Sequence, residues 1–368
     1  MTNSKPKTFF KPRRMVVESG MEETAMVQRL RTTFPGIQID HTDDANQFIS
    51  QAHDQDPDQW GNTLLLARQR GPFLRLCPGT QKHICCLYYN LDVAAGCDLG
   101  CSYCILQGYL DTPLVTVYAN HDDMYRELDH ALLDHPTRFY RIGTGELSDS
   151  LTFDPFLGLG ADLVNYFADK KNAIIELKSK NIHIDDLLGL KHNGRAVISW
   201  SMNAETVSRQ DEGIAPSLED RLKAAQQVQA AGYRIGFHFD PMIRFEGWRE
   251  EYGETIERIF RVIKPENIAW ISLGALRYPA MLDDIIRENH PESPIVLGEL
   301  LPGRDKKMRY FLPQRIEMFS FMFERIKQFS DNVFVYLCME NKYVWERSFN
   351  WAPKNSAHLK SLLDSRVT

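Results

Sequence analysis

The chain has 368 residues, of which 43% are hydrophobic and 25% are charged, and its formal net charge is −6 at pH 7. This length allows one large domain or two ordinary ones, and the acidic balance argues against a generally basic coat for nucleic acid. The sequence contains no hydrophobic run of 18 residues or more and no apolar leader, so we expect a cytoplasmic protein without a membrane segment. Seven cysteines in that compartment indicate metal or redox chemistry rather than disulfides.

The predicted elements begin with an irregular α/β segment, with a helix at Glu22–Thr33 and a strand at Thr63–Ala67. From residue 87 to 275, short β-rich runs alternate with amphipathic helical stretches. Strands are expected at Tyr88–Ala94, Arg138–Gly143, Asn172–Leu177, Ala196–Met202, Arg234–Phe239 and Ile268–Leu273, and helices at Asp122–Asp134, Pro155–Asp169, Leu218–Ala231 and Tyr252–Ile263.

This alternation predicts an α/β fold with a parallel sheet. Six βα units are too few to close an eight-stranded barrel, so we expect a partial (β/α)6 TIM-type barrel with its chemistry at the carboxyl ends of the strands. The expected division is an N-terminal extension over 1–86, the barrel over 87–275 and a C-terminal cap over 276–368. The cap is expected to contain a helix at Gln314–Phe329 and a strand at Asn332–Cys338.

Cys97, Cys101 and Cys104 follow the first predicted barrel strand with the spacing Cys-x3-Cys-x2-Cys. Iron–sulfur clusters normally take four cysteine ligands, so three leave one iron open. A zinc site and a redox dithiol are the alternatives, although zinc sites usually show two Cys or His pairs. The spacing, with Tyr103 before the third cysteine, resembles the radical S-adenosylmethionine (SAM) superfamily. That resemblance implies a [4Fe-4S] cluster and SAM as cofactors.

Glu146, Ser148 and Asp149 follow the second predicted barrel strand, directly after Gly143 and Gly145. Glycines let a ligand approach the backbone closely, and a carboxylate with a hydroxyl can hold an ammonium group and a ribose. This segment resembles the element that binds the SAM amino group in radical SAM proteins. The alternative is a turn in which Ser148 or Asp149 caps the next helix.

The next strands also end in polar residues. Lys178 ends the third strand, where it could meet the SAM carboxylate, and alternation sends Ser199, Ser201 and Asn203 of the fourth to one face. His238 and Asp240 end the fifth strand. Either they contact substrate or they form a satisfied structural pair.

Several separated motifs between residues 88 and 265 resemble the spore photoproduct lyase family. They are the three-cysteine loop with Tyr103-Cys104-x-Leu106-Gln107, Val115-x-Val117-Tyr118-Ala-Asn120, Ser148-Asp149, Lys191-His192-Asn193-Gly194, Ser201-x-Asn203-Ala204, Ala231-Gly232-Tyr233-x-x-Gly236-Phe237 and Glu246-Gly247-Trp248. The resemblance implies that the adenosyl radical takes a hydrogen from a thymine-dimer lesion of DNA, and that a cysteine returns it through tyrosines. It assigns the cluster to Cys97, Cys101 and Cys104, and SAM contacts to Ser148, Asp149, Lys178, Ser201 and Asn203.

The sequence departs from the family at the steps that would end this reaction. The hydrogen-donating cysteine falls on Glu146, and the second tyrosine falls on Ile105, so only Tyr103 remains of the pair. Tyr109 or another cysteine are the candidates for a replacement. The hairpin with which the family faces DNA has no clear counterpart around Gly303–Phe311.

Four further cysteines, Cys77, Cys85, Cys86 and Cys338, lie outside the motif. Two interpretations stay open, namely an auxiliary iron–sulfur cluster and buried thiols that pack as small hydrophobic residues.

We therefore predict a radical SAM enzyme that resembles spore photoproduct lyase, with catalytic roles for Tyr103 and Glu146. The expected partners are damaged DNA and an electron donor such as flavodoxin or ferredoxin. The alternatives are a radical SAM enzyme that acts on a nucleoside, small molecule or peptide, and a zinc-binding protein without catalysis.

Overall fold

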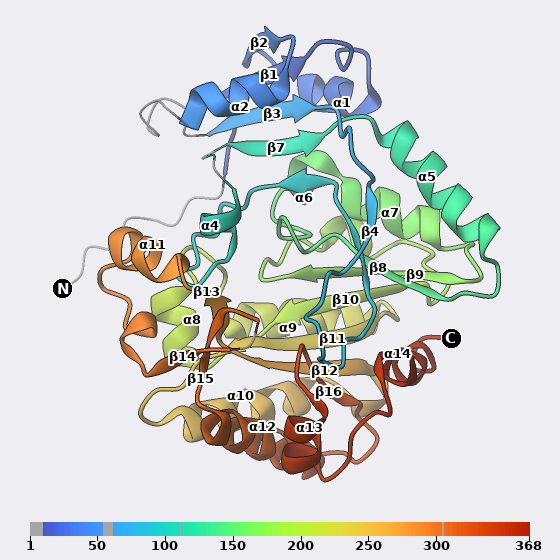
Figure 1. Cartoon of the computed structure of the whole chain (residues 1–368). Helices are drawn as coiled ribbons and strands as arrows, with labels where there is room; N and C mark the ends of the chain where they lie inside the picture. Colours follow the sequence, from blue (N-terminus) through green and yellow to red (C-terminus); the bar gives the residue numbers. More distant parts are fainter. Residues whose placement is uncertain (1–9, 54–61, 111, 113, 304) are drawn as a thin grey trace.

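An eight-stranded sheet forms the centre of the computed structural model, which describes residues 10–53, 62–110, 112, 114–303 and 305–368 (Figure 1). Its strand order is β16-β12-β11-β10-β9-β8-β5-β4, and only the β4–β5 pair is antiparallel. The strands are β4 (Leu74–Leu76), β5 (Tyr89–Leu91), β8 (Tyr140–Gly143), β9 (Ala173–Ser179), β10 (Ala196–Ser201), β11 (Arg234–Met242), β12 (Ile268–Ala275) and β16 (Val335–Leu337). The six strands from β5 to β12 are those of the predicted partial barrel.

Helices cover the outer face of this sheet, as βα connections require. α7 packs on β9, α9 on β10 and β11, and α12 on β12. The barrel helices are α5 (His121–Asp134), α6 (Asp154–Leu157), α7 (Leu159–Phe167), α8 (Glu205–Asp211), α9 (Leu218–Ala230) and α10 (Trp248–Val262). Every residue of β10 and β12 is buried, which is typical of parallel strands covered on both faces.

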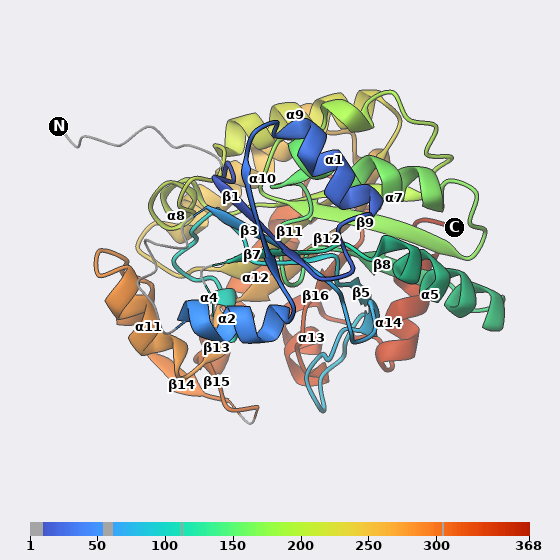
Figure 2. The ribbon, with the colours of Figure 1, turned by 90° about the horizontal axis from the view of Figure 1, so that it is seen from above.

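A second sheet joins the N-terminal segment to the barrel. Its order is β2-β1-β3-β7-β6, with β1 (Arg14–Glu18), β2 (Gln38–Thr42), β3 (Thr63–Ala67), β6 (Ala94–Ala95) and β7 (Val115–Tyr118). Alternate residues of β1 face opposite sides, so Met15 and Val17 pack with α1 (Ala25–Thr33) and Val16 packs with α2 (Ala45–His53). Figure 2 shows these two helices on either side of the strands.

The C-terminal segment adds to both the sheet and the rim of the barrel. Strand β16 extends the large sheet beyond β12, and a three-stranded antiparallel sheet follows the carboxyl end of β12. The remaining elements are α4 (Leu106–Tyr109), β13 (Arg277–Pro279), α11 (Leu282–Asn289), β14 (Leu300–Pro302), β15 (Lys307–Tyr310), α12 (Leu312–Lys327), α13 (Lys342–Phe349) and α14 (Ser356–Asp364). The predicted division at 86 and 275 stays a prediction.

Three differences from the sequence-based elements concern the barrel and its rim. The predicted strand Tyr88–Ala94 is two strands, because β5 joins the large sheet and β6 turns away to pair with β7. The predicted helix Pro155–Asp169 breaks at Gly158, which adopts a left-handed φ of +61°. Strands β14 and β15 form an antiparallel hairpin over 300–310, where the sequence showed no clear one.

None of the helices in the described ranges combines the length and the apolar composition that a membrane crossing requires.

Candidate functional site

The three motif cysteines lie on one loop between β6 and α4. Cys101 is buried, and Cys97 and Cys104 are half-buried. Cys97 has both Cys101 and Cys104 as electrostatic neighbours, and Cys101 also has Cys104 as a neighbour. The three thiols therefore face a common region. Burial raises the pKa of each thiol, that of Cys101 to about 12, because a thiolate is poorly solvated there.

This set of donors fits an iron–sulfur cluster. Each cysteine of a four-iron cluster binds a different iron, and bound iron takes the place of the thiol proton. Within the described ranges, no three His, Cys, Asp or Glu side chains are close enough together to hold one metal ion. Three cysteines account for three of the four irons and leave the fourth open to another ligand.

Two acidic residues at the end of α8 anchor the cysteine loop. Ser102 donates twice to Asp211, from its N–H to the carbonyl at 2.8 Å and from its hydroxyl to the carboxylate at 2.7 Å. The Tyr103 hydroxyl donates to one oxygen of Glu212, and Arg221 of α9 donates to the other at 2.5 Å. These residues are buried, so the loop is tied to the barrel helices by a fully internal network.

The anchoring network is charged. Burial alone would raise the pKa of Glu212, but Arg221 and Lys180 hold it down to about 2. Burial and the Glu212 charge together keep the pKa of Tyr103 well above its usual range. The Tyr103 hydroxyl therefore stays protonated and donates a hydrogen bond to Glu212. This contact anchors the loop.

Lys180 belongs to this site, and the sequence analysis missed it. Its amine lies 5.5 Å from the centroid of the Tyr103 ring, and Cys101, Glu212 and Asp149 are among its electrostatic neighbours. Burial opposes its charge, yet the neighbouring anions raise its pKa overall. It can offset the negative charge of cluster thiolates. Lys180 lies two residues after Lys178 and therefore on the same side of the strand end. This spacing could have identified it from the sequence.

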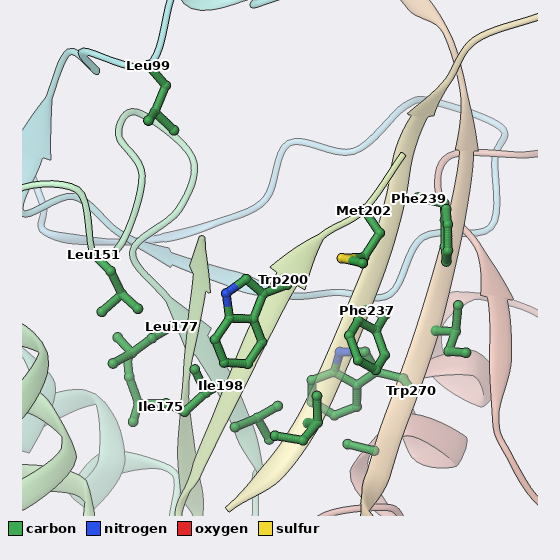
Figure 3. Packing of buried hydrophobic residues seen from close by; sticks show 14 of the residues in the cluster. Leu99, Leu151, Ile175, Leu177, Ile198, Trp200, Met202, Phe237, Phe239 and Trp270 are labelled. Carbon is green, nitrogen blue, oxygen red and sulfur yellow. The ribbon is translucent and has the colours of Figure 1, made fainter. Parts of the chain in front are cut away.

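Gly213 lets the segment after α8 pass against the cysteine loop. Its φ is +51°, and a β-carbon there would lie 1.9 Å from the carbonyl oxygen of Leu99. The N–H of Ile214 donates to that same oxygen at 2.8 Å. Figure 3 shows the Leu99 side chain beyond the arrowheads of the strands. Backbone contact on this side therefore positions the loop.

Replacing Gly213 by alanine is expected to displace the cysteine loop, because the new methyl group would collide with backbone. We expect less iron per chain after reconstitution and a stability loss of at least about 2 kcal/mol, measured by iron assay and urea denaturation. Gly194→Ala is the matched control, since Gly194 also has a positive φ, +72°, but open space around its β-carbon position. Equal losses in the two variants would show that only backbone strain matters.

Asp149 joins the turn after β8 to the end of β9. Its carboxylate accepts from the Leu151 N–H at 3.0 Å, the Ser179 hydroxyl at 2.6 Å and the Lys180 N–H at 2.7 Å. The next helix, α6, has Phe153 at its N-cap, so the helix-cap alternative for Ser148 or Asp149 is wrong. Asp149 therefore holds Lys180 in place.

Glu146 and Lys178 are electrostatic neighbours at the barrel mouth. Glu146 accepts a hydrogen bond from the Asn90 amide, and Asp92 is a further acidic neighbour. The Lys178 side chain passes Gly145 so closely that a β-carbon there would lie 3.2 Å from its Cε. Gly145 thus gives the lysine room to reach the mouth.

Ser199, Ser201 and Asn203 are all buried. Asn203 donates to the Pro241 carbonyl at 3.1 Å and accepts from the Tyr252 hydroxyl at 2.5 Å. Most of its hydrogen-bonding capacity therefore goes to joining β10, β11 and α10.

Glu176 is the centre of a polar network inside the barrel. The Ser199 hydroxyl lies 2.5 Å, His238 Nε2 2.8 Å and Trp270 Nε1 3.0 Å from one of its oxygens. Burial opposes its charge, but His238 and the hydrogen bonds lower its pKa to about 2. Asp240 pairs instead with Arg277 at 2.8 Å. The predicted pair of His238 and Asp240 is thus replaced by two satisfied pairs with other partners.

The four remaining cysteines also lie near one another. Cys86 and Cys85 are electrostatic neighbours of Cys77, and Cys338 has Cys86 and Cys77 as neighbours. Burial raises the pKa of Cys77 to about 11. Arg277 donates to the Cys338 sulfur at 3.4 Å. An auxiliary cluster at these residues stays a prediction.

Comparison with known proteins identifies the family. The spore photoproduct lyase family model matches residues 10–322. A spore photoproduct lyase from a Geobacillus strain is 26% identical over 57% of this chain and 63% of the relative, so the chain spans slightly less than two thirds of its length. The Bacillus subtilis spore photoproduct lyase is also 26% identical, over 79% of this chain and 85% of the relative.

Solved structures show the same fold. A cysteine-to-alanine mutant of spore photoproduct lyase superposes with a TM-score of 0.80 over 90% of this chain and 100% of that chain, at 23% identity. A double mutant of the same enzyme with bound AdoMet and dinucleoside spore photoproduct superposes with a TM-score of 0.77 over the same shares. The partial-barrel prediction is confirmed.

Proposed function

The chain belongs to the spore photoproduct lyase family, and we propose on that premise that it is a radical SAM enzyme that repairs spore photoproduct, a thymine-dimer lesion of DNA. The meeting of three cysteine thiols at the carboxyl ends of the barrel strands carries this proposal. The family match over 10–322 contains this loop and every residue assigned to SAM.

In this proposal Cys97, Cys101 and Cys104 hold a [4Fe-4S] cluster with one iron open to SAM. When bound, the cluster and SAM supply a 5′-deoxyadenosyl radical, which starts hydrogen abstraction. The protein holds and shields these groups. Lys180, whose charge lies beside Cys101, compensates the negative cluster and its thiolates.

The proposed SAM contacts divide into two groups by their surroundings. Lys178 at the mouth supplies a cation for the SAM carboxylate, and the buried hydroxyls of Ser148 and Ser201 supply hydrogen bonds. Asp149 and Asn203 already bind backbone groups of the barrel. We propose that Asp149 and Asn203 position the other SAM contacts. Their remaining lone pairs or protons bind SAM itself.

Tyr103 and Glu146 are the residues for which the resemblance implies catalytic positions. The Tyr103 hydroxyl binds Glu212, which favours loop anchoring, and its relay role stays a prediction. Glu146 lies next to Lys178 and Asn90. We propose that Glu146 binds the SAM amino group, since its carboxylate is not a hydrogen-atom donor.

Damaged DNA is the proposed substrate, and a lesion must leave the base stack to reach the mouth. Lys82, His83 and Lys307 line a cavity of about 540 Å³ between the 79–83 turn and the β14–β15 hairpin. These side chains suit contact with phosphates flanking the lesion. An electron donor such as flavodoxin or ferredoxin is the proposed second partner. The cytoplasm is the proposed compartment, because an open cluster and seven free cysteines need reducing surroundings.

An anaerobic assay with reconstituted protein, reductant, SAM and dinucleoside spore photoproduct tests the proposal. We expect recovered thymine together with 5′-deoxyadenosine, both measured by chromatography. Formation of 5′-deoxyadenosine without thymine would reject the lesion and direct the search to a nucleoside, small molecule or peptide. Absence of both products would reject radical SAM chemistry.

A further inference from the structure

A radical reaction that starts by removing a hydrogen atom from its substrate leaves a carbon radical at the end. A hydrogen atom must then be returned, and a thiol S–H bond is among the weakest X–H bonds that side chains offer for this. Glu146 occupies the position that the family resemblance assigns to the donor cysteine, and a carboxyl O–H is too strong a bond. The identity of the donor in this chain is the question that follows from the proposed function, and the inference rests on that function.

Cys77 faces the barrel interior from the neighbouring strand. β4 pairs antiparallel with β5, with Arg75 opposite Asn90 and Leu76 opposite Tyr89. The next pair is Cys77 opposite Tyr88, and the Cys77 N–H donates to the Tyr88 carbonyl at 2.8 Å. Opposite residues of an antiparallel pair project to the same face, so Cys77 and Tyr88 share one face.

Contacts of the neighbouring residues show which face this is. The Tyr88 hydroxyl hydrogen-bonds to Glu176, which belongs to the polar network inside the barrel. Asn90, two residues further along β5 and on the same face, donates to Glu146. Arg75, two residues before Cys77, pairs with Asp92. The Cys77 side chain therefore projects into the barrel interior, level with the amino-terminal end of β5.

Cys77 also differs from the other cysteines around it. Glu146 is among its main electrostatic neighbours, whereas Arg141 is the main charged neighbour of Cys86, and Asp240 of Cys338. Two residues after Cys77, the turn from Gly79 to His83 lines the 540 Å³ cavity beside the hairpin. Cys77 thus lies between the barrel interior and an open surface.

We propose that Cys77 is the hydrogen-atom donor that ends the reaction in this enzyme, in place of the residue at position 146. In this step the S–H bond of Cys77 breaks homolytically and a C–H bond forms at the substrate radical. The product then has no unpaired electron, and Cys77 becomes a neutral thiyl radical. One electron from the low-potential donor that the enzyme already uses, with one proton from water, restores the thiol.

The test compares C77S with C86S, which removes a thiol from the same group of cysteines. We expect C77S to form 5′-deoxyadenosine within about twofold of wild type while recovered thymine falls at least about 100-fold. C86S is expected to match wild type in both.

Three further measurements test the assignment, and two of them, alkylation and iron content, need no turnover. Thiols exchange with solvent, so thymine formed by wild type in D₂O is expected to carry one returned deuterium. Alkylation of Cys77 by iodoacetamide, followed by mass spectrometry, is expected to slow when the dinucleoside lesion binds. Iron per chain is expected to be equal in C77S and wild type.

Undiminished thymine recovery by C77S would overturn the assignment, and so would a lower iron content that makes Cys77 a cluster ligand. If wild type cleaves SAM but recovers no thymine, the proposed function fails and the donor role fails with it. If wild type recovers thymine and C77S does too, the function stands and only the donor assignment fails.

Discussion

Replacing Cys101 by alanine is expected to abolish SAM cleavage. Cys101 is the most buried of the three motif thiols, and its loss leaves two ligands for a cluster that needs three from the protein. We expect the brown colour of the reconstituted protein to disappear and 5′-deoxyadenosine to fall by at least about 10⁴-fold, to background. Iron assay, absorbance and chromatography measure these losses.

Cys338→Ser is the control for this variant, because it removes a half-buried thiol outside the loop. If one cluster is present, wild type and C338S should both contain about four irons per chain. About eight irons in wild type, with a loss in C338S, would support the auxiliary cluster. Retained SAM cleavage in C101A would contradict the cluster assignment itself.

Replacing Arg221 by alanine is expected to destabilise the fold by about 3–5 kcal/mol, because it leaves the Glu212 carboxylate buried without its main partner. Both side chains are almost completely buried, at 0% and 1% exposure, and Arg221 also donates to the Ser201 carbonyl at 2.9 Å. We therefore expect an additional loss of iron binding, since Glu212 anchors Tyr103. Urea denaturation of the protein without its cluster measures the change in the free energy of unfolding.

The pH dependence of this loss identifies its origin. Glu212 has a folded-state pKa of about 2 against an ordinary value of 4.5, so its stabilising contribution is complete above pH 4.5 and disappears as the pH falls towards 2. The difference between wild type and R221A should therefore shrink below pH 4.5. Arg258→Ala, which removes a partly exposed pair with Glu205, should cost about 0–1 kcal/mol. A cost of R221A no larger than that of R258A would mean that Lys180 alone compensates Glu212.

Much of the site was predictable because its residues are grouped along the chain. The three cysteines lie within eight positions, and Glu146, Ser148 and Asp149 lie within four. Parallel strands place their carboxyl ends at one edge, so polar residues that follow separate strands were expected to meet. The observed neighbours Glu146 and Lys178, and the contact of Ser199 with Glu176 inside the barrel, agree with that expectation.

The anchoring network was not predictable by the same reasoning. Tyr103 and Glu212 are 109 residues apart, and Glu212 follows a short helix that the sequence analysis did not identify. An acidic residue after a helix is usually a solvated one, and only packing shows that this one is buried with Arg221 and Lys180. Lys180 likewise follows a strand, and a lysine at such a position is usually solvated.

By itself, the sequence determined the βα order, the partial barrel, the family and the cysteine loop, because each depends on local pattern and spacing. The tertiary structure decided which of these groups already have partners. Asp149 and Asn203 hydrogen-bond to backbone groups, and the antiparallel β4–β5 pair places Cys77 on the same face as Asn90, which contacts Glu146. Antiparallel pairing and the compensation of buried charges join separate segments of the chain. Neither can be predicted from the periodicity of the sequence.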